Sequence, residues 1–147
     1  MKDLKLNSLR DLQREGKSFY WSSFFLPKKY KETAGILYSI CRYFDDIADN
    51  DKDDKTTFLN NAIDKIKKDN LNEVNIFLKE NNINISIFSD LIHGLIIDQK
   101  KITIKNKNDL INYSYHVAGT VGLMMSKVIG VKNKKAASSA IDLGIAM

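Results

Sequence analysis

The sequence predicts an all-α protein of six or seven helices. Apolar residues recur three and four positions apart along most of the chain, which is the spacing of an amphipathic helix. No stretch alternates apolar and polar residues as a half-buried strand does. One proline and seven glycines in 147 residues leave few interruptions, so several helices should be long.

The composition fits one compact domain, or part of one. The chain is 44% hydrophobic and 28% charged, which is typical of a folded protein in water. Cys41, the one cysteine, excludes an internal disulfide and fits a reducing compartment. The first twenty residues are charged throughout, which argues against a signal peptide. The sequence has no run of about 18 apolar residues, so no membrane-spanning helix is predicted. We therefore expect a cytoplasmic protein.

The net charge of +5 comes mainly from dispersed lysines. A nucleic-acid-binding domain carries its basic residues as a patch or stripe, so no nucleic-acid partner is expected. Scattered positive charge can favour anionic lipid surfaces or anionic substrates, but a solvated face explains it better.

Two helices are predicted in the N-terminal part of the chain, with an aromatic-rich segment between them. Leucines at helical spacing predict a helix over residues 3–15, which Gly16 would end as a C-cap residue. The aromatic-rich segment from Lys17 to Pro27 is suited to a short buried helix. Pro27 fits the first turn of the next helix, which should run to about Asp49.

The middle of the chain should hold two or three further helices. After a loop over residues 50–55, apolar spacing from Thr56 to Glu80 predicts one helix, or two interrupted near residues 70–72. Residues 81–84 should form a turn. An amphipathic helix is predicted from Ile85 to Ile102.

A helix that begins near residue 106 carries a long apolar stripe. Asn106 or Asn108 would cap it, and Gly130 would end it. The stripe consists of Leu110, Tyr113, Val117, Val121, Met124 and Val128. A turn over residues 132–135 should follow.

The last predicted helix begins near Ala136 and is still running at Met147. A complete protein rarely ends on an apolar helix without a capping residue. We therefore expect residues 1–147 to be a single all-α domain that is incomplete, the N-terminal part of a longer protein.

An acidic cluster closes the helix that ends near Asp49. Six of the ten residues in 45–54 are aspartate, in a chain that is otherwise basic. Asp45 and Asp49 lie one helical turn apart, which places their Cβ atoms about 5–6 Å from each other. Arg42 and Tyr38 extend the same face toward the N-terminus.

Two like charges at this spacing weaken a helix, so a compensating partner is expected. Mg²⁺ is commonly held by one or two carboxylates together with substrate phosphates. The planar guanidinium of Arg42 suits phosphate oxygens. A metal–phosphate site is one interpretation of the cluster, and a solvated acidic helix end is the other. Asp51, Asp53 and Asp54 are assigned to the following loop.

The segment from Tyr113 to Met125 is unusual for a helix. Gly119 and Gly122 are mid-helix, where each costs about 1 kcal/mol relative to alanine. With Ala118 they form a surface of small residues, which permits either close helix packing or a bulky apolar ligand against the backbone. On the residues alone, Tyr113 suits a core aromatic with a satisfied hydroxyl better than a catalytic group.

Together these motifs resemble those of the squalene and phytoene synthases. The pattern CRxxDDxxD followed by YxYxVAGxVG is specific, and the resemblance covers about residues 17–147. The matching blocks are SFY at 18–20, LP at 26–27, CRYFDDIAD at 41–49, GLIID at 94–98 and YSYHVAGTVGLMM at 113–125. HVAGTVGLMM followed by IGV is most similar to bacterial phytoene synthases.

The resemblance implies the N-terminal part of an isoprenoid-synthase helical bundle with a central cavity. It implies a prenyltransferase that joins two geranylgeranyl diphosphates head to head into 15-cis-phytoene through a cyclopropyl diphosphate, in carotenoid biosynthesis. The alternatives are a squalene or dehydrosqualene synthase that uses farnesyl diphosphate, and a non-catalytic relative that binds prenyl lipid or assists assembly. NADPH is expected only for the squalene type.

The resemblance also implies roles for individual residues. Asp45 and Asp49 would bind Mg²⁺, for which Mn²⁺ can substitute, and would act in catalysis with Tyr113. The residues expected to bind substrate are Ser18, Phe19, Tyr38, Arg42 and Val117. The very apolar product would favour peripheral contact with the inner face of the membrane.

Three departures from the family pattern stand out. A second Asp-rich motif, NxxRDxxxD, is expected beyond Met147, so the 147-residue chain alone should be inactive. Gly16 stands where many relatives have serine, which puts one phosphate contact in doubt. His93 stands where relatives often have aspartate.

Overall fold

The computed structural model describes residues 12–51, 53–99 and 102–147, and within these ranges it contains helices and turns but no strand. The predicted all-α class is confirmed. The chain divides into two compact units, Met1–Tyr43 and Phe44–Met147. Helix α3, Lys28–Asp49, runs from the first unit into the second. None of the described helices is long and apolar enough to cross a bilayer.

The described part of the first unit holds helical residues 12–15, then α2, Lys17–Ser22, and the 3-10 helix η1, Ser23–Phe25. Gly16 separates residues 12–15 from α2, as predicted. Most of the helix predicted over 3–15 lies outside the described residues. The Pro27 carbonyl accepts the first backbone hydrogen bonds of α3, so that helix starts where the sequence placed it.

The expectation that the aromatic segment after Gly16 is buried is wrong. No residue of α2 is buried, and Trp21 is 70% exposed. Phe19 rests near Tyr38 of α3, with ring centroids 6.4 Å apart. The segment carries more aromatic surface than one face of a six-residue helix can cover, so the remainder is exposed.

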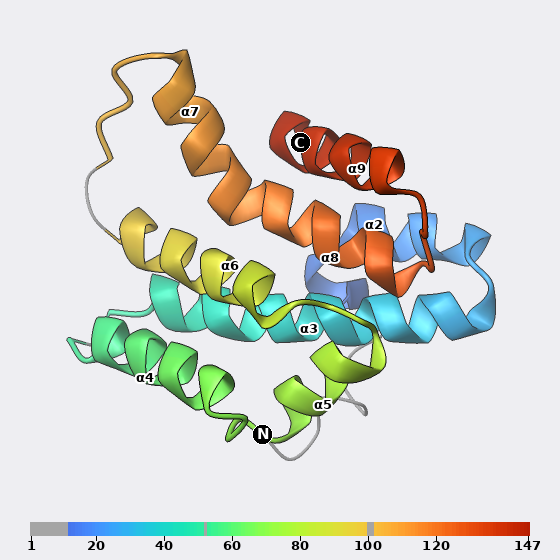
Figure 1. Ribbon diagram of the computed structural model, residues 1–147, viewed down its shortest axis with the longest axis horizontal. Coiled ribbons are helices and arrows are strands. Elements are labelled where there is room, and N and C mark those ends of the chain that lie inside the picture. Colours follow the sequence, from blue (N-terminus) through green and yellow to red (C-terminus); the bar gives the residue numbers. More distant parts are fainter. Residues whose placement is uncertain (1–11, 52, 100–101) are drawn as a thin grey trace. The chain divides into compact units, whose positions relative to one another are not determined.

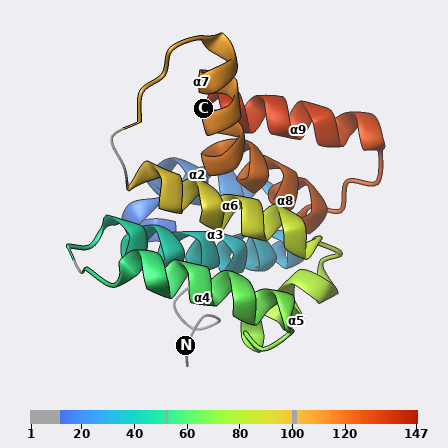
Figure 2. The ribbon, with the colours of Figure 1, turned by 60° about the vertical axis from the view of Figure 1, so that its left-hand side comes forward.

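Helix α6 occupies the middle of the second unit, with α4 on one side and the α7–η2–α8 segment on the other (Figure 1 and Figure 2). Its sequence is apolar around most of its circumference, which is typical of a buried helix. The elements of this unit that follow α3 are α4 Lys55–Lys67, α5 Glu73–Glu80, α6 Ile85–Asp98, α7 Lys107–Ser114, the π-helix η2 Tyr115–Gly119, α8 Thr120–Val128 and α9 Lys134–Ala146.

Apolar side chains at the predicted helical positions form the core of this unit. Phe44 and Phe88 meet edge to face, with centroids 5.5 Å apart. The other fully buried large apolar side chains are Leu59, Ile66, Val74, Leu78, Ile92 and Met124.

The break between α4 and α5 falls where the sequence predicted it. Asp69 and Asn72 adopt positive φ angles of 57° and 37°, which end the helix and reverse the chain. The buried Asn75 holds this break through two hydrogen bonds. Its Nδ2 donates to the Ile66 carbonyl at 2.9 Å, and its Oδ1 accepts from the Leu71 N–H at 3.1 Å.

Three predicted boundaries are refined by side-chain caps and local composition. Asn106, not Asn108, caps α7, because its side chain accepts the Asp109 N–H at 3.0 Å. Helix α9 begins at Lys134 rather than Ala136, because Asn133 provides an earlier cap. Helix α6 ends at Asp98, four residues short of the predicted end at residue 102.

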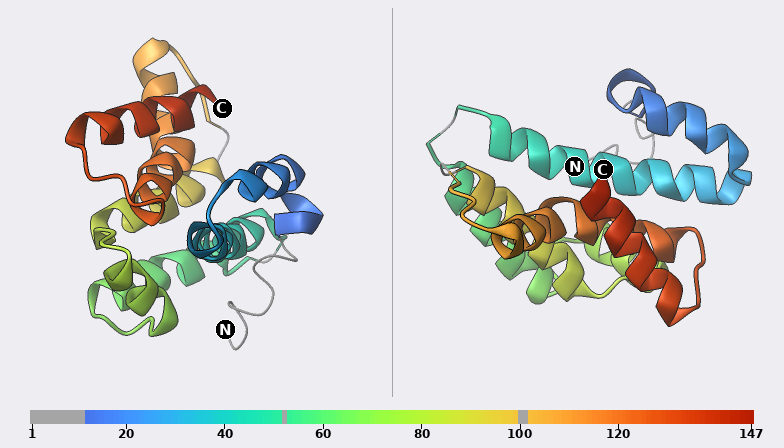
Figure 3. Two further views of the ribbon diagram at one scale, coloured as in Figure 1. Left: turned by 90° about the vertical axis from the view of Figure 1, so that its right-hand side faces the viewer. Right: turned by 90° about the horizontal axis from the view of Figure 1, so that it is seen from above.

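Helices α8 and α9 approach each other closely through glycine (Figure 3). A Cβ atom on Gly122 would lie 2.2 Å from the Ala140 carbonyl oxygen, and one on Gly144 would lie 2.5 Å from the Ala118 oxygen. The backbone of α9 therefore packs against Gly122 of α8, and the backbone of η2 packs against Gly144 of α9. Of the two predicted uses of the small-residue surface, close helix packing is the one observed at Gly122.

We expect Gly122→Ala to destabilise the fold by about 1–3 kcal/mol, because the new methyl group collides with a backbone oxygen that has little freedom to move. Urea denaturation followed by far-UV circular dichroism measures this change. Ser138→Ala, at an exposed position of α9, is the matched control and should stay within about 0.5 kcal/mol of the parent. Equal unfolding midpoints for Gly122→Ala and the parent would contradict the close approach.

Candidate functional site

Asp45 and Asp49 both lie in α3, so the helical spacing expected of them is present. Asp45 is half-buried, and Asp49, the last residue of the helix, is exposed. Asp51, Asp53 and Asp54 lie outside the helices and are exposed, which agrees with their assignment to a loop.

Side-chain contacts tie the end of α3 to the ends of two other helices. The Lys55 ammonium, at the start of α4, donates to the Asn50 carbonyl at 3.0 Å, just after α3 ends. One residue on, the Thr56 hydroxyl donates to Gln99 Oε1 at 2.6 Å, just after α6 ends. The C-terminal ends of α3 and α6 therefore lie at the same end of the second unit (Figure 1 and Figure 2).

Tyr113 reaches this end of the unit from α7. Its hydroxyl donates to Asp98 Oδ1 at 2.6 Å, and Asp98 immediately precedes Gln99. Since Asp49 immediately precedes Asn50 in the same way, the α3 carboxylates and the Tyr113–Asp98 pair are gathered at one end of the unit. The sequence singled out Tyr113 but not its partner, although Asp98 closes the GLIID block.

Asp98 changes the acidity of Tyr113. The hydrogen bond to the carboxylate, then burial, then the negative charge of Asp98 raise the pKa of Tyr113 to about 12. The phenol is therefore protonated at neutral pH. Burial, followed by the nearby Asp90 carboxylate, also raises the pKa of Tyr115.

The segment predicted as one regular helix contains a π-helical turn, η2, that includes Val117. Gly94 of α6 makes room for it, because a Cβ atom there would lie 2.9 Å from the Cβ of His116. The buried Thr120 hydroxyl donates to the His116 carbonyl at 2.8 Å and helps to hold the turn. Such turns occur frequently at functional sites, and no periodicity in the sequence signals this one.

In the first unit, Ser18 and Phe19 lie exposed on α2, and Tyr38 lies half-buried on α3. Gly16 fits beneath the Tyr38 ring, since a Cβ atom there would lie 3.0 Å from the ring carbon Cζ. A serine at residue 16 would press on that ring. The position of the Tyr38 ring therefore favours glycine over the family's serine at residue 16.

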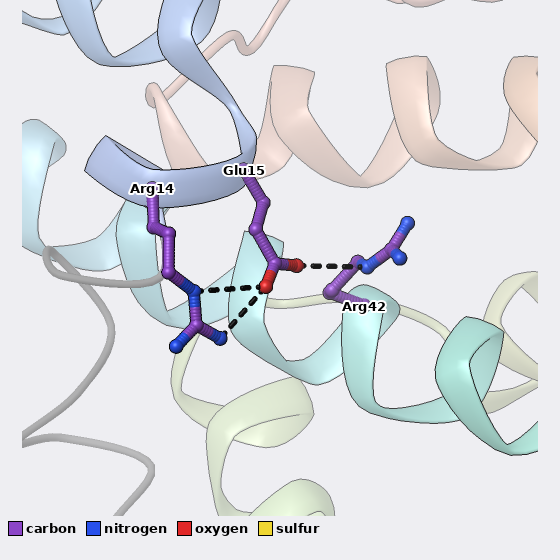
Figure 4. A network of polar contacts seen from close by, with 3 residues as sticks. All are labelled: Arg14, Glu15 and Arg42. Atoms are coloured by element: carbon purple, nitrogen blue, oxygen red, sulfur yellow. Dashed lines mark hydrogen bonds and ion pairs between the residues drawn. The ribbon is translucent and has the colours of Figure 1, made fainter.

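Arg42 is held by a carboxylate that the sequence analysis did not single out (Figure 4). Its Nε lies 3.1 Å from Glu15 Oε2. Arg14 donates to Glu15 Oε1 through Nη2 at 2.7 Å and through Nε at 3.0 Å. Chiefly because of the Arg14 hydrogen bond, the pKa of Glu15 is lowered, so this carboxylate stays ionised between two guanidinium groups.

The oxygen donors of Asp45 and Asp49 suit a hard divalent cation such as Mg²⁺ or Mn²⁺. Within the ranges 12–51, 53–99 and 102–147, no group of three or more His, Cys, Asp or Glu side chains is placed to hold a metal. Two carboxylates nevertheless fit Mg²⁺ when substrate phosphates and waters complete its shell.

The sequence matches the squalene/phytoene synthase family over residues 12–147. The chain belongs to this family. A 15-cis-phytoene synthase of Paracoccus sp. is 26% identical over 99% of the chain and 54% of its own length. A second relative, phytoene synthase 1 of Arabidopsis thaliana, is 43% identical over 44% of the chain and 17% of its own length.

The structure also has the fold of this family. A dehydrosqualene synthase crystal structure aligns with a TM-score of 0.84 and 23% identity, over 99% of the chain and 54% of the other protein. The expected isoprenoid-synthase helical fold is confirmed. The chain spans about half the length of two curated 15-cis-phytoene synthases, which it matches over 99% and 88% of its own length.

We expect Asp98→Asn to lower the pKa of Tyr113 from about 12 toward its ordinary value of 10.0, because the charged acceptor is lost. A pH titration by NMR with ¹³Cζ-labelled tyrosine measures this, and Tyr113→Phe assigns the signal. Asp64→Asn, an exposed change on α4, should leave the titration unchanged. An unaltered Tyr113 titration in Asp98→Asn would show that this hydrogen bond is not formed.

The same pair makes stability depend on pH. The pKa of Tyr113 is raised in the folded chain, so the stabilising contribution is fully present below pH 10.0 and is lost as the pH rises toward about 12. The stability difference between the parent and Tyr113→Phe should therefore be constant below pH 10.0 and should shrink above it. Urea denaturation at several alkaline pH values checks this.

Proposed function

We propose that the protein is a prenyltransferase that joins two geranylgeranyl diphosphates head to head into 15-cis-phytoene, through a cyclopropyl diphosphate. The gathering of the α3 carboxylates and the Tyr113–Asp98 pair at one end of the second unit carries this proposal. It is supported by family membership and by the phytoene synthases among the relatives, from Paracoccus sp. to Arabidopsis thaliana.

The difficult step of such a reaction is the departure of diphosphate, which leaves an allylic cation. When bound, Mg²⁺ supplies Lewis-acid stabilisation of the charge that develops on the leaving oxygens. Asp45 and Asp49 would hold the Mg²⁺ near the C-terminal end of α3, where Asp45 is half-buried and Asp49 is exposed. Arg42, one turn earlier on the same helix, would bind diphosphate oxygens with its terminal nitrogens, while Glu15 engages its Nε.

Tyr113 would act beside the departing diphosphate as a neutral phenol. Its pKa of about 12 keeps the proton on the hydroxyl at neutral pH. The one hydroxyl proton is donated to Asp98, so Tyr113 would donate to a phosphate oxygen only by exchanging that partner, whereas a phenolate would repel the phosphate. Asp98 is therefore a positioning residue that fixes the ring.

The remaining candidates would contact the prenyl chain or the diphosphate. Phe19 and Tyr38 present aromatic rings next to each other, and ring faces attract a developing cation. Val117 contributes an apolar side chain from η2. Ser18 offers a small hydroxyl to the diphosphate.

In the protein at its natural length, Asp45→Asn should lower the turnover of geranylgeranyl diphosphate about a hundredfold or more, since a catalytic metal contributes several kcal/mol. It should also weaken Mn²⁺ binding measured by electron paramagnetic resonance, a readout that does not depend on turnover. Asp64→Asn on α4 is the matched acidic control and should change neither. Full activity and full Mn²⁺ affinity in Asp45→Asn would refute the metal role.

Product chromatography with each prenyl diphosphate separates the enzyme alternatives. Phytoene from geranylgeranyl diphosphate, without NADPH, is the expected product. Formation of squalene or dehydrosqualene from farnesyl diphosphate would show that the substrate is farnesyl diphosphate, and the reaction type would stay the same. Prenyl-diphosphate binding without any product would instead support a non-catalytic relative.

A further inference from the structure

The Glu15 carboxylate joins two arginines from different segments of the first unit (Figure 4). Its Oε1 accepts hydrogen bonds from Arg14, through Nη2 at 2.7 Å and through Nε at 3.0 Å. Its Oε2 lies 3.1 Å from the Nε of Arg42. Arg14 and Glu15 precede α2, whereas Arg42 lies in α3. Each carboxylate oxygen is therefore used by a different guanidinium group.

Arg42 presents only one edge of its guanidinium group to Glu15. The contact is made by Nε, and the two terminal nitrogens point away from the carboxylate (Figure 4). An arginine binds phosphate oxygens best through two parallel N–H groups, and its terminal nitrogens offer such a fork. Glu15 thus holds Arg42 by the edge that leaves this fork directed elsewhere.

Arg14 keeps the Glu15 carboxylate suited to this contact. Its hydrogen bond is the main cause that lowers the pKa of Glu15, and the positive charges of Arg14 and Arg42 lower this pKa further. The carboxylate is therefore ionised at neutral pH. An isolated exposed ion pair orders its side chains little, but here one carboxylate is held from two sides. The two positive charges and one negative charge leave the cluster able to attract an anion.

We propose that Glu15 is a positioning residue for the binding of diphosphate oxygens. It holds Arg42 by Nε, so that the two terminal nitrogens are already directed at the ligand, and Arg14 anchors Glu15 from the other side. An arginine that is ordered before binding loses less rotamer freedom when the ligand arrives. The role of Glu15 rests on the proposed function, because that function assigns diphosphate binding to Arg42.

The opposite role for Glu15 is that of an internal competitor, a carboxylate that occupies Arg42 until diphosphate displaces it. A competitor would take the terminal nitrogens, since these are the donors that diphosphate needs. The observed contact is made by Nε instead. The geometry therefore favours positioning over competition.

Two substitutions of Glu15 separate orientation from charge. Glu15→Gln and Glu15→Ala remove the same negative charge, but only glutamine keeps an oxygen that accepts a hydrogen bond from Arg42. Binding of inorganic diphosphate in the presence of Mg²⁺ is measured by isothermal titration calorimetry, with the protein at its natural length. Glu15→Ala should bind diphosphate about five- to tenfold more weakly than Glu15→Gln, because Arg42 must then be ordered on binding.

Glu32 provides the matched control, because it is an exposed glutamate of α3 in the same unit. Glu32→Gln and Glu32→Ala should bind diphosphate equally. Circular dichroism checks that all four variants fold.

A second readout follows Arg42 without any ligand. In ¹⁵N NMR spectra, the Nε–H proton of Arg42 should exchange with water faster in Glu15→Ala than in the parent, because the carboxylate no longer lies beside it. Arg42→Lys assigns the signal. An unchanged exchange rate in Glu15→Ala would show that Glu15 does not hold Arg42.

Equal diphosphate affinities of Glu15→Gln and Glu15→Ala would overturn the positioning role. Binding that is tighter than in the parent by the same factor in both variants would identify Glu15 as a competitor. The expected difference between the two variants, in a protein that forms no prenyl product, would leave the positioning role standing and refute the proposed function. Product formation without that difference would refute the positioning role alone, and a parent that binds no diphosphate would refute both.

Discussion

The hydrogen bond from Tyr113 to Asp98 is the contact on which the second unit's candidate site depends. It joins α7 to the end of α6, and the neighbouring contacts of Thr56 and Lys55 join that end to α4 and to the end of α3. Elements far apart in the sequence thereby place polar groups at the same end of the unit. The same bond raises the pKa of the Tyr113 phenol to about 12, so it extends the pH range over which the hydroxyl stays protonated.

Small residues allow the helices around this site to approach closely enough. Gly94 makes room for the π-helical turn at His116. Gly122 lets α8 meet α9 backbone to backbone, and Gly144 does the same for α9 and η2. A methyl group at any of these positions would push the helices apart. The cost of glycine inside a helix is thus offset by packing that larger residues would prevent.

The first unit divides its aromatic residues between two environments. Phe19 lies beside Tyr38, whose ring packs over Gly16. Trp21, Phe24 and Phe25 remain exposed beside lysines. A sequence rich in aromatics predicts burial by default, and burial fails here because a short helix and a 3-10 turn offer too little covering surface.

The sequence by itself determined the helical class, most helix boundaries and the family. These features depend on residues that are close together in the sequence. Examples are the apolar spacing within a helix, the cap formed by Asn106, and the aspartates of α3. Only the tertiary structure decided the partners of Tyr113 and Arg42, the exposure of the aromatic segment and the position of the π-helical turn. Asp98 is fifteen residues from Tyr113, and Glu15 is farther still from Arg42. Such pairs exist only after separate helices have packed, because no periodicity along one helix encodes which side chain a second helix will present.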